Sequence, residues 1–380
     1  MSGSDFVRSL PTHESPTRQR VANLPFDPIL LTLLLTVMSF GLIVLYSAAD
    51  QQTSAVVNQA LRLGLGLVLM LALAQLPPRL YLRWTPLGYA AGVVLLVLVL
   101  WVGVTVKGSQ RWLEIPGLIR FQPSELMKLA VPLMVAWYFH DRALPPKLSD
   151  VFVALGLIAV PALLIIQQPD LGTGLLVAAA GIIVVLLAGL PWRYLAVALG
   201  SACALAPLAW FYALQDYQKR RIRTLFDPES DPLGAGWNIR QSTTAIGSGG
   251  LDGKGLFQGT QSHLDFLPES RTDFIIAVIG EELGFGGVLL LLLLYLVIVA
   301  RCVHTATLAR ESFERLICGA LTFTFFVYVF VNVAMVSGML PVVGVPLPLI
   351  SYGGTSAITL LIGFGLIMSV YLSVHGNRRW

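Results

Sequence analysis

The sequence predicts an all-α polytopic membrane protein with about ten transmembrane helices. Of its 380 residues, 56% are hydrophobic and only 12% are charged, and the mean hydropathy is +0.76. About a quarter of the residues in a water-soluble domain are normally charged. The composition therefore excludes an ordinary soluble enzyme, a disordered chain and a nucleic-acid-binding protein. Ten spans of about 20 apolar residues would use roughly 200 residues, which fits the hydrophobic fraction.

Long apolar stretches place the ten spans along the chain. They cover residues 28–49, 58–76, 86–104, 121–139, 151–167, 173–190, 194–214, 274–300, 315–337 and 352–374. Residues 28–374 are thus predicted to be one membrane domain, with cytoplasmic tails at 1–27 and 375–380. The connection 215–273 between spans seven and eight is long for a compact bundle and keeps apolar residues, so we expect an ordered extracytoplasmic loop.

The distribution of basic residues predicts the orientation. With the N-terminus inside, the cytoplasmic segments hold thirteen Lys and Arg residues: Arg8, Arg18, Arg20, Arg79, Arg83, Arg142, Lys147, Arg193, Arg301, Arg310, Arg315, Arg378 and Arg379. The short outer loops hold only Lys107, Arg111 and Arg120. This is the positive-inside asymmetry of a protein with both termini in the cytoplasm. It also explains the pI near 9.0 without a nucleic-acid partner.

Two charged residues open the fourth span, where the chain reads FQPSELMK from residue 121. Glu125 and Lys128 are three residues apart, so they share one helix face and can form an ion pair. An ionisable residue at membrane depth is costly unless it is paired or wet, and is by default a functional candidate. The pair is therefore either a structural contact or the wall of a water-filled cavity, which Arg62 of the second span could also line.

Two neighbouring loops carry further candidates on the same predicted side. Arg111 and Trp112 suit the headgroup level, where Trp anchors a protein, and they also suit contact with a lipid-linked phosphate. Asp170 lies in the short loop before the sixth span. It is interpreted either as a helix cap or as a carboxylate of the site.

The long loop contains a basic run and a glycine-rich stretch. The run 219–223 includes Arg220 and Arg221, which are interpreted as a solvated face, a headgroup contact or a diphosphate-binding group. The stretch 246–261 resembles a phosphate loop but lacks the Gly and the Ser or Thr that a Walker motif requires. Its glycines are predicted to form tight turns that approach the bundle or a ligand.

Acidic residues gather where the long loop enters span eight. Asp273 stands at the predicted mouth of this helix beside Arg271, and Glu281 and Glu282 follow about two turns later. Helix capping alone does not explain three acids along one helix start. The last outer loop, 341–356, contains Ser351 and is too rich in Pro and Gly for a regular helix. It is predicted to re-enter the bundle and close one side of a site.

Five blocks of the chain together resemble the SEDS family of membrane proteins. They are GSQRW at 108–112, FQPSELMK at 121–128, QPDLG at 168–172, GTQSHLDFLPESRTDF at 259–274 and GVPLPLISYGG at 344–354. The resemblance covers everything except the N-terminal tail. The residues of these blocks are most similar to those of the elongation members of the family. Ser270, His263 and the residue at 265 depart slightly from the family pattern without removing a necessary group.

The resemblance implies a peptidoglycan glycosyltransferase in the bacterial cytoplasmic membrane. Such an enzyme polymerises lipid II, a disaccharide-pentapeptide on undecaprenyl diphosphate, on the outer face. Asp273 matches the family's essential carboxylate and is assigned as the general base on the acceptor 4-hydroxyl. Substrate contacts are expected from Arg111, Trp112, Glu125, Lys128, Asp170, Arg220, Arg221, Arg271 and Ser351.

The resemblance also implies the partners of the protein. These are a class B penicillin-binding protein that acts as the transpeptidase, and other membrane proteins of the elongation complex. A divalent cation, Mg²⁺ or Mn²⁺, suits a carboxylate-rich site, and no organic cofactor is expected. Two other functions stay open from the residues alone. One is a lipid II flippase or another transporter of lipid-linked substrates, and the other is a scaffold that docks a periplasmic partner.

Overall fold

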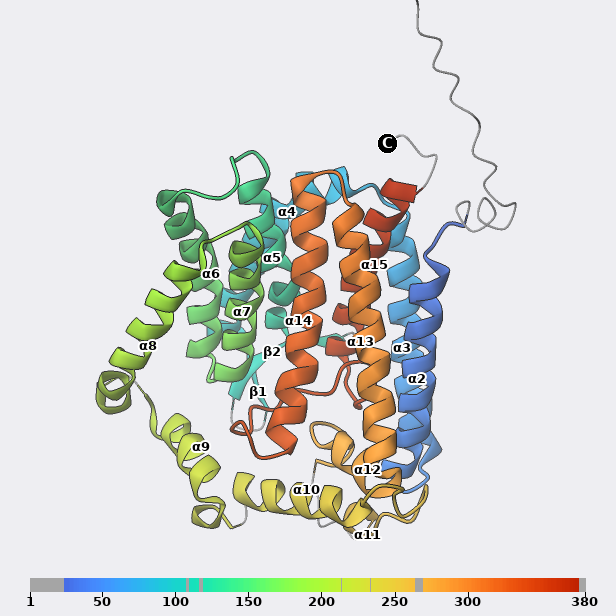
Figure 1. Ribbon diagram of the computed structural model, residues 1–380. Coiled ribbons are helices and arrows are strands. Elements are labelled where there is room, and N and C mark those ends of the chain that lie inside the picture. Colours follow the sequence, from blue (N-terminus) through green and yellow to red (C-terminus); the bar gives the residue numbers. More distant parts are fainter. Residues whose placement is uncertain are drawn as a thin grey trace, which may run out of the picture.

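The computed structural model describes residues 24–106, 109–115, 119–212, 214–232, 234–263 and 269–375. Most of the predicted tails and residues 264–268 lie outside this part. Long helices run side by side through the molecule (Figure 1). They are α2 (Pro28–Ala48), α3 (Thr53–Ala74), α4 (Pro78–Val102), α5 (Pro123–His140), α6 (Leu148–Gln167), α7 (Leu171–Leu187), α8 (Trp192–Tyr212), α13 (Gly284–Leu308), α14 (Ser312–Val336) and α15 (Thr355–His375).

Seven of these helices are long and apolar enough to cross a membrane: α2, α3, α4, α6, α13, α14 and α15. The prediction of a helical membrane protein is therefore confirmed at this level. Helices α5, α7 and α8 lie where three further spans are predicted. Helix α5 differs from the seven because it has polar residues near its start and is only 18 residues long. Helix α7 has only 17 residues.

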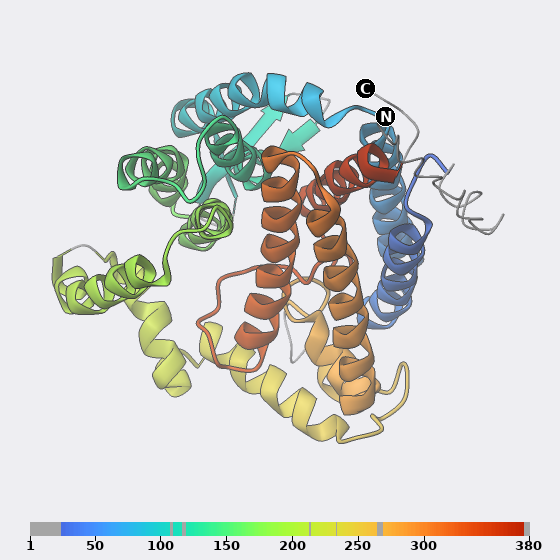
Figure 2. The ribbon, with the colours of Figure 1, turned by 45° about the horizontal axis from the view of Figure 1, so that its top comes forward.

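The most buried of the seven spans are α14 and α15, which lie at the centre of the bundle. Helix α15 packs along α3, and α14 packs on α5, α7 and α13. Helix α8 lies at the periphery in both views (Figures 1 and 2). At one end of the bundle the fully buried Asp27 caps α2 and accepts a 2.8 Å hydrogen bond from Arg301 of α13. This ion pair joins the first span to the later helices.

The all-α prediction is wrong for the segment between α4 and α5. Its described residues form three antiparallel strands, β1 (Val104–Val106), β2 (Ser109–Ile115) and β3 (Ile119–Phe121), in the order β1-β2-β3. The β-branched residues at both ends of the segment favour strands. In β2 the side chains alternate, since Leu113 is buried and Glu114 is exposed. The sheet packs against α4 and α5 (Figure 2).

The described residues of the long connection form four helical segments. They are α9 (Asp216–Phe226), the 3-10 helix η1 (Pro228–Ser230), α10 (Ala235–Gly249) and α11 (Thr260–His263). Helix α10 runs across the end of the bundle, and α12 (Ile275–Glu282) lies beside it (Figure 1). The segment therefore covers one end of the long helices.

The predicted continuous span 274–300 is also wrong, because the helix breaks at Leu283. Helix α12 ends there and α13 starts at Gly284, which has a positive φ of 66°. A Cβ at Gly284 would lie 2.4 Å from the main-chain nitrogen of Gly253. Glycine is thus required by the close approach of two backbones. Glu281 and Glu282 consequently precede the spanning helix instead of lying two turns inside it.

The glycine-rich turn supplies the hydrogen bonds that the helix break removes. The main-chain N–H groups of Lys254 and Gly255 donate to the carbonyls of Glu281 and Glu282, at 3.0 and 2.9 Å. The prediction that these glycines form tight turns against the bundle is confirmed. The Glu282 side chain accepts a 2.6 Å hydrogen bond from Ser47 of α2. Both acids therefore hold the turn and α12 in place.

The Glu281 carboxylate is an anchor for the loop, and its pKa reflects this. Burial by itself raises the pKa of this carboxyl. Hydrogen bonds from Lys254, the Gln261 N–H and Thr260, together with the charge of Lys254, bring the pKa below its ordinary value. A carboxyl whose pKa is lowered by folding stabilises the folded state at neutral pH. That stabilisation is lost as the pH falls through the lowered folded-state value.

The Glu281→Gln substitution is expected to lower thermal stability at pH 7 by about 1–3 kcal/mol, since charged hydrogen bonds are lost. The difference from the wild type should be constant above the ordinary glutamate pKa of about 4.3 and shrink below it. Thermal unfolding in detergent at a series of pH values measures this. Asp216→Asn, which removes an exposed carboxylate of α9, should show no such trend. An equal destabilisation at every pH would contradict the assignment.

Candidate functional site

A polar pocket lies between α5, β2, α7 and the segment that connects α14 to α15. It encloses about 570 Å³ of empty space, including its opening. Its walls are Arg111, Trp112, Gln122, Glu125, Lys128, Asp170, Thr173, Leu176, Gly344, Val345, Pro346, Gly354, Thr355 and Ser356. Five of the residues predicted for the site therefore share one pocket: Arg111, Trp112, Glu125, Lys128 and Asp170.

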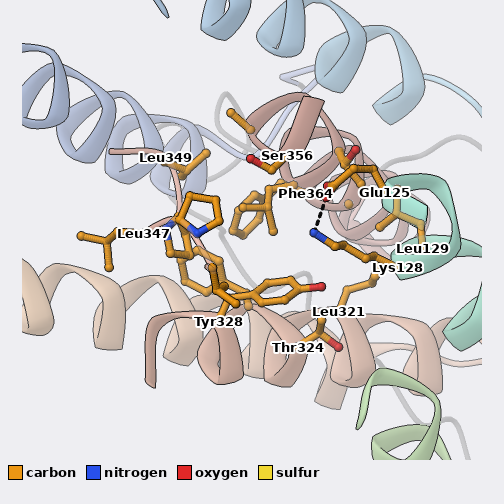
Figure 3. Close-up of a pocket in the computed structure, with 18 of the residues that line it drawn as sticks. Glu125, Lys128, Leu129, Leu321, Thr324, Tyr328, Leu347, Leu349, Ser356 and Phe364 are labelled. Carbon is orange, nitrogen blue, oxygen red and sulfur yellow. Dashed lines mark hydrogen bonds and ion pairs between the residues drawn. The ribbon is translucent and has the colours of Figure 1, made fainter. Parts of the chain in front are cut away.

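Glu125 and Lys128 form an ion pair at the inner wall of this pocket. The Lys128 Nζ lies 2.5 Å from Glu125 Oε1, and the two side chains are only 11% and 9% exposed. The helix starts with Pro123, a residue favoured in the first turn. Glu125 and Lys128 share one face because they are three residues apart. Lys128 Nζ also lies 5.2 Å from the ring centre of Tyr328 (Figure 3). Glu125 Oε2 is buried and has no hydrogen-bond partner within the described residues.

Asp170 is both a helix cap and a pocket residue. Its Oδ1 accepts a hydrogen bond from the Thr173 N–H, which caps α7. Its Oδ2 accepts from Arg111 at 3.0 Å and from Gln122 at 3.1 Å. The two interpretations of Asp170 are therefore compatible. The contact joins the strand β2 to the start of α7 across the pocket.

The cations of the pocket are already neutralised. Lys128 is paired with Glu125 and Arg111 with Asp170, so these four side chains carry no net formal charge. An anionic ligand would have to share these cations with their carboxylates. The buried Arg111 Nε has no hydrogen-bond partner among the described residues.

An apolar pocket continues from the polar one toward α14 and α15 (Figure 3). It encloses about 680 Å³ of empty space, including its opening. The two pockets share Glu125, Lys128, Val345, Pro346 and Ser356. Leu321, Phe325 and Phe364 are among its apolar walls. The charged pair thus lies at the junction of a polar and an apolar space.

Asp273 lies beside the polar pocket but is not one of its lining residues. It is half-buried and immediately precedes α12, whose N-cap is Phe274. A Cβ at Gly344, which lines the pocket, would lie 3.4 Å from Asp273 Oδ2. Gly344 has a φ of 77°, which favours glycine, and the lack of a side chain lets the carboxylate approach this part of the pocket wall.

Ser351 and Arg271 are structural neighbours of Asp273. The Ser351 hydroxyl donates to the Thr272 carbonyl and accepts from the Leu347 N–H. The Arg271 guanidinium faces the connection between α2 and α3, where it contacts the Ala48 carbonyl. Ser351 lines the apolar pocket, whereas Arg271 lines neither pocket.

Arg220 and Arg221 are not brought to either pocket. Both are on α9, which packs on η1 and α10 at the periphery of the molecule (Figure 1). Arg221 lies 5.9 Å from the ring centre of Tyr217 on the same helix. Of the cations expected to contact the substrate, only Arg111 and Lys128 line a pocket.

Sequence reasoning missed several polar residues of the site. Gln122, Thr173 and Ser356 line the polar pocket, and Asn332 of α14 bonds to the Asp273 carbonyl. Gln122 stands inside a block that carries the resemblance. Asn332 is an amide within an otherwise apolar predicted span. Because a buried polar group needs hydrogen-bond partners, such a residue indicates a contact with another polar group.

The described residues contain no group of three or more His, Cys, Asp or Glu side chains that could hold a metal ion. The two carboxylates of the polar pocket are each paired with a cation. This donor set does not fit a metal held by protein ligands alone.

The structure combines helices that are long and apolar enough to cross a membrane with a polar pocket at one end of the bundle. The family model of FtsW, RodA and SpoVE, described as "Cell cycle protein", matches residues 27–375. The chain therefore belongs to this family, as the resemblance to the SEDS proteins predicted.

Relatives and solved structures agree with this membership. The "Peptidoglycan glycosyltransferase MrdB" of Escherichia coli K12 is 50% identical over 345 residues, covering 91% of this chain and 93% of the relative. The "Probable peptidoglycan glycosyltransferase FtsW" of Trichlorobacter lovleyi is 33% identical, with 91% and 93% coverage.

Two solved structures share the fold. The rod shape determining protein RodA of Thermus thermophilus has a TM-score of 0.70 at 32% identity, covering 92% of this chain and 98% of that one. A chain from a peptidoglycan synthase complex, whose description refers to coordination of polymerization and crosslinking, has a TM-score of 0.81 at 33% identity. It covers 93% of this chain and 100% of that one.

Proposed function

We propose that the protein is a peptidoglycan glycosyltransferase that polymerises lipid II during cell elongation. The observation that carries the proposal is the junction of the two pockets. The pair Glu125 and Lys128 lies where the polar pocket meets the apolar one. The Asp273 carboxylate lies next to Gly344, which lines the polar pocket. Lipid II has a sugar, a diphosphate and an isoprenoid chain, so its headgroup suits such a junction. A relative of 50% identity is named a peptidoglycan glycosyltransferase.

In the proposed reaction, Asp273 takes the proton of the acceptor sugar's 4-hydroxyl. The oxygen then attacks C1 of the donor sugar, the bond from C1 to the diphosphate breaks, and undecaprenyl diphosphate leaves. Lys128 and Arg111 would stabilise the negative charge that develops on the diphosphate. Glu125 and Asp170 would orient these cations, and Trp112 would border the headgroup. Arg220, Arg221 and Arg271 are retained as candidates only for contacts outside the pockets.

The proposed topology has ten spans, with both termini in the cytoplasm and the pockets facing outward. The positive-inside distribution of Lys and Arg supports this orientation. Helices α5, α7 and α8 would be the three additional spans, since their positions match the predicted ones. The protein would then be a multi-pass protein of the bacterial inner membrane, with α9 to α12 on the extracytoplasmic side.

The proposed partner is a class B penicillin-binding protein that cross-links the new strands, together with other membrane proteins of the elongation complex. The likeness to a chain from a peptidoglycan synthase complex supports a transpeptidase partner. A Mg²⁺ or Mn²⁺ ion, if used, would accompany the diphosphate of the substrate, because the described side chains do not form a metal site of their own.

Purified protein in proteoliposomes with its transpeptidase partner tests the function. We expect glycan polymer to form from labelled lipid II and to disappear when the substrate is omitted. Lipid II on the two leaflets should be quantified in the same samples. Transbilayer movement of lipid II without any polymer would overturn the proposal and favour a flippase. Polymer in samples that contain the partner alone would also overturn it.

A further inference from the structure

The amide of Asn332 joins two segments that border the polar pocket. Asn332 is completely buried in α14, and its Nδ2 donates to the carbonyls of Asp273 and Val345, at 2.8 and 2.7 Å. A primary amide has two N–H donors, so both are used. Its Oδ1 is buried and has no partner among the described residues. The side chain therefore serves the fold through its two donors.

The two carbonyls belong to functionally different segments. Val345 lines both pockets, and a Cβ at the preceding residue, Gly344, would lie 3.4 Å from Asp273 Oδ2. Asp273 lies in a turn before α12, where its carbonyl would otherwise have to find another donor. Asn332 thus fixes the main chain of Asp273 relative to the wall of the pocket.

The two carbonyls before Asp273 are held by the same connection. The Arg271 carbonyl accepts a 2.8 Å hydrogen bond from the Tyr352 N–H, and the Thr272 carbonyl accepts from the Ser351 hydroxyl. Three successive carbonyls are therefore fixed by α14 and the segment after it. Asn332 acts on the carbonyl of Asp273 itself, which makes its contact the most direct one.

We propose that Asn332 is a positioning residue for Asp273, holding the carboxylate at the pocket through the main-chain carbonyl. The proposal rests on the proposed function, in which Asp273 is the base. Rotation of the main chain at Asp273 would swing its carboxylate away from Gly344. A misplacement of about 1 Å at a reacting group can lower the rate by roughly 100-fold. Asn332 lines neither pocket, so its amide does not contact a substrate bound there.

The test uses Asn332→Leu, which keeps a similar size and removes both donors. We expect kcat for lipid II polymerisation to fall by roughly 10- to 100-fold, with KM within about 3-fold of the wild type. Hydrogen exchange should become faster in residues 269–276 and remain unchanged in α14 away from residue 332. The matched control is Thr322→Val, which removes a buried hydroxyl that donates to the Cys318 carbonyl in the same helix. It should behave as the wild type in both measurements.

A second variant, Asn332→Asp, separates positioning from folding. Its ionised carboxylate has no donor for either carbonyl, whereas its protonated form donates to one of them. The ratio of its kcat to that of the wild type should therefore rise as the pH falls. Protonation also removes the buried charge and so restores folding, which is why the folded fraction is measured at each pH and kcat is expressed per folded molecule.

Wild-type kcat in Asn332→Leu would overturn the proposal. So would faster exchange spread evenly over the bundle, because that result indicates a general structural role. If the wild-type protein makes no polymer, the proposed function fails. The exchange measurement then still decides whether Asn332 holds the turn at Asp273.

Discussion

Asp273→Asn protein is expected to polymerise lipid II roughly 100- to 10,000-fold more slowly than the wild type, which is the usual contribution of a general base. An amide has the shape of the carboxylate but cannot accept the proton of the acceptor hydroxyl. The main-chain contact from Asn332 to the residue at 273 does not involve the side chain and should persist. The loss should therefore appear in catalysis and not in folding.

Two measurements separate these effects. The affinity for lipid II, measured with the purified variant, should remain within a few-fold of the wild type, because a base acts in the transition state more than in binding. The thermal unfolding temperature should also be retained. Asp252→Asn is the matched control, since Asp252 is an exposed carboxylate in the glycine-rich turn. Polymerisation by Asp273→Asn at the wild-type rate would show that Asp273 is not the base.

Local spacing predicted the parts of the site that lie within one element. Glu125 and Lys128 are three residues apart on α5, and the structure pairs them as the helix period requires. Hydropathy likewise located the helices, because the apolar surface of a span is a property of that segment alone. The backbone turn at Gly253 was predicted as a tight turn, whereas the positive φ at Gly284 was not predicted.

Contacts between distant segments could not be predicted in the same way. The pairing of Arg111 with Asp170 joins a strand to a helix 59 residues later, and no local period indicates it. Arg220 and Arg221 had the right charge for a diphosphate, but α9 packs at the periphery. The break at Leu283 depends on the approach of the backbone near Gly253, which is a tertiary contact. A charge pattern selects candidates, and packing decides which of them meet.

Lys128→Met is expected to have the second large effect, because it leaves the Glu125 carboxylate buried without its cation. Breaking a buried ion pair by removing one partner typically costs about 3–5 kcal/mol. The variant should therefore unfold at a clearly lower temperature and lose polymerisation. This result alone does not distinguish a structural ion pair from a functional one.

The double variant Glu125→Leu/Lys128→Met distinguishes them. Replacing both charges by apolar side chains removes the buried carboxylate, so most of the stability should return. Polymerisation should nevertheless remain roughly 100-fold or more below the wild type, because a charge that stabilises the leaving diphosphate is missing. Recovery of both stability and activity would show that the pair is only structural.

The ion pair between Arg142 and Asp150 provides the comparison for these effects. Its Nε to Oδ1 distance is 3.2 Å, and the Arg142 side chain is 38% exposed. Exposed pairs contribute about 0–1 kcal/mol, so Arg142→Met should change stability little and leave polymerisation intact. The contrast with Lys128→Met would then come from burial and from the position of Lys128 between the two pockets, since both substitutions remove one cation from one ion pair.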